Sequence, residues 1–591
     1  MNCPSRTDPI VGDGMNQSPS AMASDVTTRS DFGRIANARS LRSHRLDEKD
    51  QDAPREESVT LRPPSLAGGK GEGVGVRSEP GRTGSTGRTS PCTNAAGLSK
   101  PLTPLAHLRS SARSLARILT KFSKFIGPGF MVSVAYIDPG NYATDVAAGA
   151  SYRFRLLFMI LLSNLFAIFL QSLCIKLGSV TGMNLAEMIK AHCPPWLNYL
   201  LYFFAESAII ATDIAEVIGT AIALNLLLKI PLVAGCAISI VDVLFILLFY
   251  RPTTGSLRGL RAFEFFVMLL VLGVVICFCF QLSMIDRSTT SAREVFAGYL
   301  PSKALVESKG LYQACGILGA TVMPHSLYLG SGIIQARLKD FDRVHMPPAA
   351  GPDAAPNHRE AEASADTTND DDDGPKYRPS LTAIHSCLTY SIVELALCLF
   401  TFALFVNSAI LIVAGAALYN TPGAEDADLF GIHALLASTL APVAGTVFAL
   451  ALLLSGTSAG IVCTIAGQMV SEGQLNLRIR PWLRRLMTRS ISIVPSIIIA
   501  GAVGGKGLSA ALEGSQVALS VILPFVSAPV IYFTCRNKFM SVEVRQGENG
   551  EVGGLVKMRN HWFVAVLGVV IWLVVVIMNV ALLVLVGLGV E

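Results

Sequence analysis

The chain has 591 residues, of which 51% are hydrophobic and only 15% are charged, and its formal net charge is +5. Soluble globular chains carry about 25% charged residues, so this composition excludes an ordinary soluble domain and predicts a polytopic membrane protein. The twelve cysteines lie mostly inside apolar runs, with no CxxC pair or regular spacing, so neither a disulfide framework nor a zinc site is indicated. The small net charge gives no indication of nucleic acid binding.

The first part of the chain lacks a long apolar run. From Met1 to about Pro104 it is rich in Ser, Gly, Pro, Arg, Asp and Thr, a composition that cannot offset the entropy of ordering the backbone. We therefore predict a disordered cytoplasmic N-terminal tail over residues 1–112, through which trafficking or ubiquitination partners would bind, and a membrane domain over 113–591. No charged segment followed by an apolar one opens the chain, so the first spanning helix is expected to act as the signal anchor.

Apolar runs predict eleven membrane-spanning helices. Their expected bounds are Ile126–Ala150, Leu156–Leu177, Tyr199–Leu228, Leu232–Tyr250, Phe263–Leu282, Leu311–Ala336, Ala383–Leu418, Pro442–Ser471, Ser490–Val503, Leu508–Thr534 and Trp562–Val590. The odd number places the two termini on opposite sides of the membrane. Residues 344–380, which include the run Asp370–Asp373, are predicted to be a disordered acidic cytoplasmic loop rather than a metal site, because like charges without a fold repel and extend.

Charges in the loops orient this stack, because short cytoplasmic loops carry an excess of Lys and Arg. With the N-terminus inside, the cytoplasmic loops contain Arg251, Arg258, Arg261, Arg478, Arg480, Arg484, Arg485, Arg489, Arg536, Lys538, Arg545, Lys557 and Arg559. The loop after the seventh helix has acids and no base, whereas Arg153 and Arg155 in the first outer loop go against the rule. We predict a cytoplasmic N-terminus and a non-cytoplasmic C-terminus.

The first predicted helix is interrupted at its centre by Asp138-Pro139-Gly140-Asn141. Pro139 removes a backbone donor, and Gly140 and Asn141 favour non-helical conformations. Non-helical backbone inside a membrane is tolerated only where it is buried in protein or lines a polar cavity. A charge such as Asp138 costs roughly 2.5–3.5 kcal/mol at a helix centre, which favours a functional ligand over a proline kink with a satisfied carboxylate.

The sixth helix repeats this interruption at Met323-Pro324-His325, after Gly316 and Gly319. Helices one and six would then open two halves of five helices each, and breaks in corresponding positions indicate a substrate site at the middle of the membrane. The predicted fold class is an all-α membrane protein of two inverted five-helix repeats, similar to the leucine transporter, with an eleventh helix added.

The two breaks together supply the carboxylate of Asp138, the amide oxygen of Asn141, the thioether of Met323 and freed carbonyls near Ala135 and Ala320. Oxygens alone would suit Ca²⁺ or Mg²⁺, whereas a thioether is a soft ligand that suits a transition metal. The set therefore fits a divalent ion such as Mn²⁺ or Fe²⁺. A methionine is more often a packing residue, but its place beside a proline break favours the ligand role.

Several further motifs follow in order along the chain. They are Ile126-Gly127-Pro128-Gly129-Phe130, Asp213-Ile214-Ala215-Glu216-Val217-Ile218-Gly219, Ala466-Gly467-Gln468 followed by Glu472-Gly473, and Gln516 before Leu523-Pro524-Phe525. Together with the two interrupted helices, this ordered set resembles the Nramp family of proton-coupled divalent-metal transporters from about Lys121 to the C-terminus. The long tail and the acidic loop lie outside the common core and point to a eukaryotic, fungal member. The resemblance and the ligand set imply the manganese and iron type.

The resemblance implies roles for individual residues. Asp138, Asn141 and Met323 would be metal ligands, with the carbonyls of Ala135 and Ala320 as state-dependent ligands. Gln516 would contribute to the site, or else bond a neighbouring helix. His325 would take part in proton movement, or be a satisfied core histidine, and the acids Asp213 and Glu216 on one face of helix three would belong to the proton path rather than to a structural ion pair. Where family members often have a second helix-six histidine, this chain has Gly330.

The leading prediction is a secondary active transporter that imports Mn²⁺ or Fe²⁺ into the cytosol with protons by alternating access. A metal sensor on the same scaffold, which does not transport, and an organic-substrate symporter of the same fold remain alternatives. No Walker loop, nucleophile elbow or HExxH motif is present, so the sequence does not indicate an enzyme. No cofactor is expected beside the transported ions, and the host membrane would be the plasma, endosomal or vacuolar membrane.

Overall fold

The structure, a computed structural model, describes residues 127–239, 257–345, 377–424, 427–476, 481–546 and 551–588. Within these ranges the chain is mostly helical, with one two-stranded sheet. The predicted tail over 1–112 and residues 346–376 of the predicted acidic loop lie outside the described residues. At the ends of that loop, residues 344–345 complete a helix and the side chain of Ser380 caps the next one.

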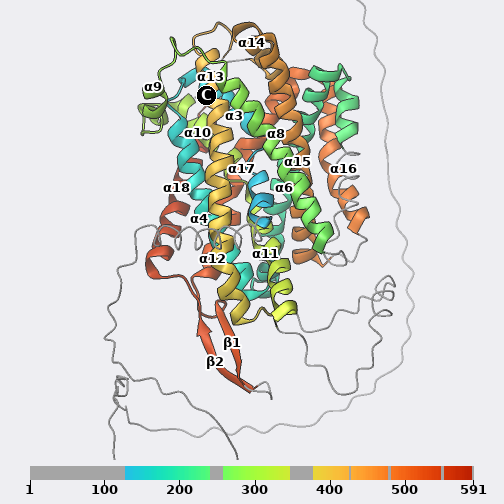
Figure 1. Cartoon of the computed structure of the whole chain (residues 1–591), viewed down its shortest axis with the longest axis vertical. Coiled ribbons are helices and arrows are strands. Elements are labelled where there is room, and N and C mark those ends of the chain that lie inside the picture. The colour runs from blue at the N-terminus through green and yellow to red at the C-terminus, as the bar shows by residue number, and fades with distance from the viewer. Residues whose placement is uncertain are drawn as a thin grey trace, which may run out of the picture. The chain divides into compact units, whose positions relative to one another are not determined.

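The helices run side by side as a bundle (Figure 1). The membrane helices are α2 (Pro128–Val134), α3 (Pro139–Tyr152), α4 (Leu157–Thr181), α6 (Pro195–Leu228), α8 (Leu257–Ser283), α10 (Ser308–Thr321), α11 (Pro324–His345), α12 (Leu381–Cys398), α13 (Leu404–Ala417), α15 (Pro442–Leu475), α16 (Pro481–Ala502), α17 (Gly505–Thr534) and α18 (Trp562–Gly587). A π-helical segment, η3 (Leu399–Ala403), joins α12 to α13 without a break.

Eight of the described helices are long and apolar enough to cross a membrane. The three other predicted spans have local reasons for falling outside this group. The first is divided into α2 and α3, which have 7 and 14 residues. Of the fourth, only residues 232–239 are described, and they are helical. The ninth contains a shorter apolar helix, Arg489–Ala502. The described helices therefore form a multi-pass membrane protein, and they follow the predicted order of spans.

Short elements fill the connections. They are α5 (Leu185–His192), α9 (Ala292–Ala297), the 3₁₀ helix η1 (Lys303–Val306), α14 (Leu429–Thr439), and the antiparallel strands β1 (Ser541–Gln546) and β2 (Glu551–Lys557), in which Ser541 pairs with Lys557. Two of these helices have side-chain caps at their N-termini. Asn184 and Glu187 form a capping box on α5, and Asp428 caps α14. Figure 1 shows α9 and α14 at one end of the bundle, here the α14 end, and the β1–β2 hairpin at the other, the hairpin end.

The bounds of α16 correct the sequence analysis. This helix begins at Pro481, whereas Ser490 was the predicted start. Arg489 was therefore wrongly assigned to a cytoplasmic loop: it lies inside the helix and its side chain is only 2% exposed. The error arose because a polar first half hides the helical period that the apolar second half displays.

The two interrupted helices cross in opposite directions. The first half of one contacts the second half of the other, because α2 packs against α11 and α3 packs against α10. Glycines permit close contacts around them. A side chain at Gly219 on α6 would overlap Pro139, and one at Gly319 on α10 would overlap the backbone of Gln516 on α17. The breaks are therefore enclosed by α6 and α17.

Arg153, which goes against the loop-charge rule, has a structural role at the α14 end. Its Nη1 lies 2.6 Å from Oε1 of Glu294 on α9, and its Nη2 donates to the carbonyl of Thr289 at 3.0 Å. The guanidinium also lies over the ring of Tyr419, 5.7 Å from its centroid. This arginine ties the loop after α3 to the loop after α8, so its charge is compensated locally.

Candidate functional site

The first break runs from Ala135 to Asp138. Asp138 has extended backbone angles (φ −106°, ψ 149°) and is the N-cap of α3, where its Oδ2 accepts from the amide of Gly140 at 2.8 Å. Its other oxygen, Oδ1, is buried and has no hydrogen-bond partner in the described part of the chain. The residue is 0% exposed. The structure therefore places a carboxylate with one free oxygen at the positive end of a half-helix.

The second break comprises Val322 and Met323, between the end of α10 and Pro324 at the start of α11. Met323 is 0% exposed, and its sulfur lies 3.9 Å from Oγ1 of Thr212 on α6. Its carbonyl accepts from the hydroxyl of Ser326 at 2.6 Å. Met323 is thus held at the break by contacts on both sides.

Each proline that follows a break frees a particular carbonyl. In a continuous helix the amide of a residue donates to the carbonyl four positions earlier, and proline has no amide hydrogen. The carbonyls left without this partner are those of Ala135, four residues before Pro139, and Ala320, four residues before Pro324. No backbone donor to either carbonyl occurs in the described ranges. These are the two carbonyls that the sequence analysis singled out.

Hydrogen bonds orient the amide of Asn141. Its Nδ2 donates to the carbonyl of Tyr136 at 3.0 Å, and the same carbonyl accepts from Nδ2 of Asn407 on α13 at 3.2 Å. The neighbouring carbonyl of Ile137 accepts from the hydroxyl of Ser455 on α15 at 2.7 Å. Because its nitrogen is engaged, Asn141 keeps Oδ1 as a buried acceptor without a partner among the described residues.

Gln516 on α17 lies directly against the first break. A side chain on Gly140 would overlap its terminal amide. Its Nε2 donates to the hydroxyl of Ser515 at 3.0 Å, whereas its Oε1 is buried without a partner among described residues. Asp138, Asn141 and Gln516 therefore each offer one buried oxygen with no donor in the part of the chain that the structure describes, and a cation would satisfy all three.

A polar group behind the breaks explains the glycine at 330. Nε2 of Gln171 on α4 donates to the hydroxyls of Tyr136 and Ser326, both at 2.9 Å, and these two hydroxyls are 2.9 Å apart. A side chain at Gly330 would overlap Oε1 of Gln171. Gln171 thus fills the space that a second helix-six histidine would need.

His325 follows the second break and faces α6. Its Nδ1 lies 3.2 Å from Oγ1 of Thr212, which itself donates to the carbonyl of Ala208 at 3.0 Å. The hydroxyl of Thr212 can therefore accept from the histidine ring. Thr212 directly precedes Asp213 in α6. The residue that contacts His325 is therefore the chain neighbour of one of the two acids, Asp213 and Glu216.

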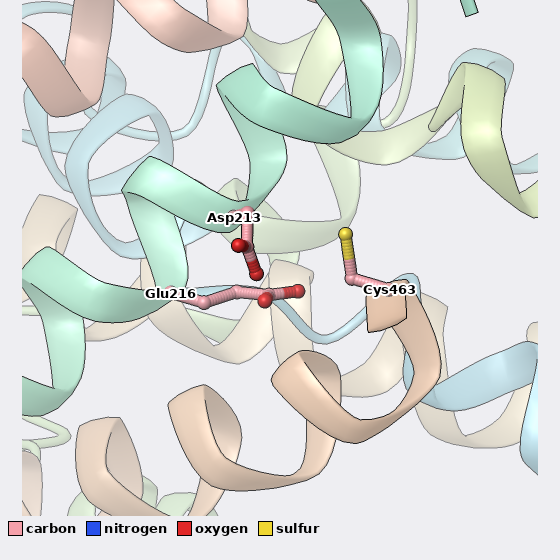
Figure 2. Close-up of side chains that lie close together, drawn as sticks. All are labelled: Asp213, Glu216 and Cys463. Carbon is pink, nitrogen blue, oxygen red and sulfur yellow. The ribbon is translucent and has the colours of Figure 1, made fainter. Parts of the chain in front are cut away.

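The acidic pair lies on α6 and shares one arginine. Arg489 on α16 contacts Asp213, and its Nη1 lies 3.0 Å from Oε2 of Glu216. Asp213 also accepts from the hydroxyl of Ser492 at 2.5 Å. Figure 2 shows both carboxylates together with the thiol of Cys463 from α15. One oxygen of each acid and the sulfur of Cys463 lie within 4.8 Å of one another. The guanidinium of Arg489 is the cation of this group, so two carboxyl groups and one arginine make up a buried cluster.

Several of these residues were not found from the sequence. Thr212, Asn407, Ser455 and Gln171 are isolated polar residues in apolar helices, and such residues carry no motif of their own. Arg489 had a signal, because two acids three apart in a membrane helix require a positive partner, and this arginine stands next to an apolar run. His325 contacts Thr212, which lies next to Asp213 along α6, so the break and the acidic pair lie beside the same helix.

The chain matches a known protein family over most of its length. The family model described as "Natural resistance-associated macrophage protein-like" matches residues 129–585. The chain belongs to the Nramp family. This confirms the resemblance predicted from the motifs, and the match covers both interrupted helices, the acidic pair and Gln516.

This Nramp chain is 50% identical over 513 residues to "Manganese transporter SMF1" of Saccharomyces cerevisiae, covering 81% of this chain and 88% of the relative. It is 52% identical over 441 residues to "Iron transporter SMF3" of the same yeast, covering 74% and 87%. Among solved structures, the manganese transporter of Eremococcus coleocola in complex with an aromatic bis-isothiourea compound is 30% identical, with a TM-score of 0.60 over 78% of this chain and 85% of the other. The predicted fold class is confirmed by this likeness.

Proposed function

We propose that this protein imports Mn²⁺ or Fe²⁺ into the cytosol together with protons, by alternating access. The observation that carries the proposal is that one buried oxygen each of Asp138, Asn141 and Gln516 has no partner among the described residues, in a chain that belongs to the Nramp family. The curated relatives named above, a manganese and an iron transporter, support the choice of cargo.

The proposed site combines two kinds of ligand. Asp138 supplies the charge, and Asn141 supplies a neutral oxygen whose direction is fixed by Tyr136. Met323 supplies a thioether, which Ca²⁺ and Mg²⁺ do not favour. The carbonyls of Ala135 and Ala320 and the amide oxygen of Gln516 complete the coordination as the helices move. No resident cofactor is part of this proposal, since the metal ion is the substrate.

Burial at the breaks supports a closed state within the transport cycle. Asp138, Asn141 and Met323 are each 0% exposed, so the structure admits no water to these side chains from either end. A metal ion must reach them, which requires that the halves of the interrupted helices move. Half-helices that meet at unwound backbone are the parts of inverted-repeat transporters that rearrange around a fixed site.

The proton path in this proposal starts beside the metal site and leads to α6. His325 contacts Thr212, the next residue is Asp213, and Arg489 joins Asp213 to Glu216. A buried group of two carboxylates and one guanidinium carries one negative charge and can take up one proton without creating an isolated positive charge. Protons and metal would therefore use adjoining but separate groups.

The proposed orientation places the hairpin end in the cytoplasm. Basic residues gather there, including Arg378, Arg536, Lys538 and Arg559, in agreement with the rule for cytoplasmic loops. At the α14 end Arg153 and Arg155 remain exceptions to that rule, and the charge of Arg153 is paired with Glu294. The N-terminal tail would then be cytoplasmic and open to trafficking or ubiquitination partners. We propose a plasma, endosomal or vacuolar membrane as the location.

Uptake into proteoliposomes tests the function. The purified chain should take up Mn²⁺ when the outside is acidic, and the uptake should acidify the lumen. Asp138→Asn keeps the shape of the side chain but removes the anionic ligand, so it should nearly abolish uptake while the protein stays folded, because a neutral amide is cheaper to bury than a charge. Full uptake by the folded variant would reject the site.

A further inference from the structure

Five carboxylates are 3% exposed or less among the residues that the structure describes: Asp138, Asp145, Asp213, Glu216 and Glu394. Three of them have an arginine partner. Arg489 serves the pair on α6, and Arg337 lies 2.9 Å from Oε2 of Glu394. The other two, Asp138 and Asp145, have no salt bridge within the described ranges.

Asp145 is the more isolated of these two. Asp138 accepts from the amide of Gly140. Asp145 is 1% exposed, its Oδ2 is buried without a partner, and no hydrogen bond to its side chain occurs in the described part of the chain. An ionised carboxylate that is buried without a partner costs several kcal/mol, so a positive ion or a proton must neutralise it.

The position of Asp145 on α3 favours a metal ion, rather than a proton, as the group that neutralises it. Residues three and seven positions apart lie on one face of a helix, because each residue turns by about 100°. Asp138, Asn141 and Asp145 have this spacing, so the three side chains form one stripe. Asp145 lies about 10 Å from Asp138 along the axis, since each residue rises about 1.5 Å. It is on the side of the α14 end.

The neighbouring helices carry oxygens at the same level. α3, α10 and α17 contact one another pairwise. On α10, Nε2 of Gln313 donates to the carbonyl of Ala147 at 3.3 Å and to the hydroxyl of Ser151 at 3.2 Å, while its buried Oε1 has no partner among described residues. On α17, Glu513 lies one turn nearer the α14 end than Gln516 and is partly exposed.

We propose that Asp145 holds the divalent cation transiently between the α14 end and the Asp138–Asn141 site, as a relay residue of the transport reaction. This inference rests on the proposed function. The physical advantage is stepwise dehydration: a carboxylate before the site replaces part of the ion's water shell before the thioether of Met323, a poor substitute for water, enters the coordination.

The first experiment separates apparent affinity from turnover. Mn²⁺ uptake is titrated in proteoliposomes for the parent, Asp145→Asn and Asp145→Ser, with Glu307→Gln as a matched control that removes an exposed acid at the same end. Loss of a residue that supports metal binding costs about 10–100-fold in affinity, so both Asp145 variants should raise KM about tenfold and keep the maximal rate within about twofold. The control should match the parent. An unchanged KM, or a fall in maximal rate alone, overturns the relay.

The second experiment is direct Mn²⁺ binding to the detergent-purified protein by isothermal titration. Asp138→Asn should retain weak binding, and Asp138→Asn combined with Asp145→Asn should lose it. Equal binding by these two variants, or no binding to the Asp138→Asn variant, contradicts an ion station at Asp145 while leaving the main site intact. A parent that binds no Mn²⁺ would instead reject the proposed function itself.

Discussion

Asn141 donates its amide hydrogen to the carbonyl of Tyr136, 3.0 Å away and five residues earlier in the chain. This bond spans the first break, because Tyr136 lies between α2 and α3 whereas Asn141 is in the first turn of α3. It holds the amide so that the oxygen, and not the nitrogen, remains available. One contact therefore sets both the shape of the unwound segment and the ligand that it presents.

Selectivity should depend on Met323. We expect Met323→Ala to keep some Mn²⁺ transport and to admit Ca²⁺ or Mg²⁺ far better than the parent, because the space left by the thioether can hold a water that supplies the missing oxygen. The measurement is uptake of Ca²⁺ and Mn²⁺, each titrated under the same pH gradient. If the ratio of the two stays as in the parent, Met323 is a packing residue.

The acidic pair and Arg489 should be coupled in stability. Arg489→Gln leaves two buried carboxylates without their cation, and breaking a buried pair in this way costs roughly 3–5 kcal/mol. Thermal unfolding in detergent should show a lower Tm, and adding Glu216→Gln should recover part of the loss. A double variant with the Tm of Arg489→Gln alone would show that the two residues do not interact.

Neutralising Asp213 and Glu216 should weaken the coupling of metal transport to protons. Asp213→Asn combined with Glu216→Gln is expected to weaken the proton dependence of transport more than metal binding, because these carboxylates lie on α6 rather than at the breaks. The double change leaves Arg489 buried without an anion, so Arg489→Gln is added to keep the protein stable. Proton flux and Mn²⁺ affinity are measured together. A collapse of affinity with coupling intact would move the pair into the metal site.

Glu394 should hold the start of α2 in place. Its Oε1 accepts from the amides of Gly127 and Gly129, at 2.8 Å and 3.1 Å, while Arg337 engages its Oε2. Glu394→Ala leaves these amides without an acceptor, so α2 should open more readily. Hydrogen–deuterium exchange over residues 127–134 should accelerate about tenfold, which corresponds to about 1.4 kcal/mol. Exchange at the parent rate would mean that Glu394 does not restrain this half-helix.

We predict that the side chain of Gln171 makes glycine necessary at position 330. We expect Gly330→His to lower the Tm, because the new side chain overlaps Oε1 of Gln171 and core overpacking costs about 1–3 kcal/mol. Gly330→His combined with Gln171→Ala should regain most of that stability, since the alanine vacates the space. Gln171→Ala alone is the control. If the double variant is no more stable than Gly330→His, another contact excludes the histidine.

The sequence by itself determined the two breaks and the order of those spans that the structure describes. A membrane span needs about 20 apolar residues, and proline with glycine inside such a run leaves few conformations open. For the same reason the carbonyls of Ala135 and Ala320 could be named from the sequence, since a proline four residues later removes a helical donor at a known place. These features depend on residues close together in the chain.

Only the tertiary structure decided which distant residues meet. Arg489 was assigned to a loop, although it is the partner of two acids more than 270 residues earlier in the chain. Gln171 and Gly330 compensate for one another in volume, and Asn407 fixes a carbonyl of the first break, yet neither relation leaves a local pattern. Asp145 belongs to none of the motifs, and its burial without a partner among the described residues is a property of the packed structure. Burial and pairing depend on how helices pack, and side chains far apart in sequence supply the contacts.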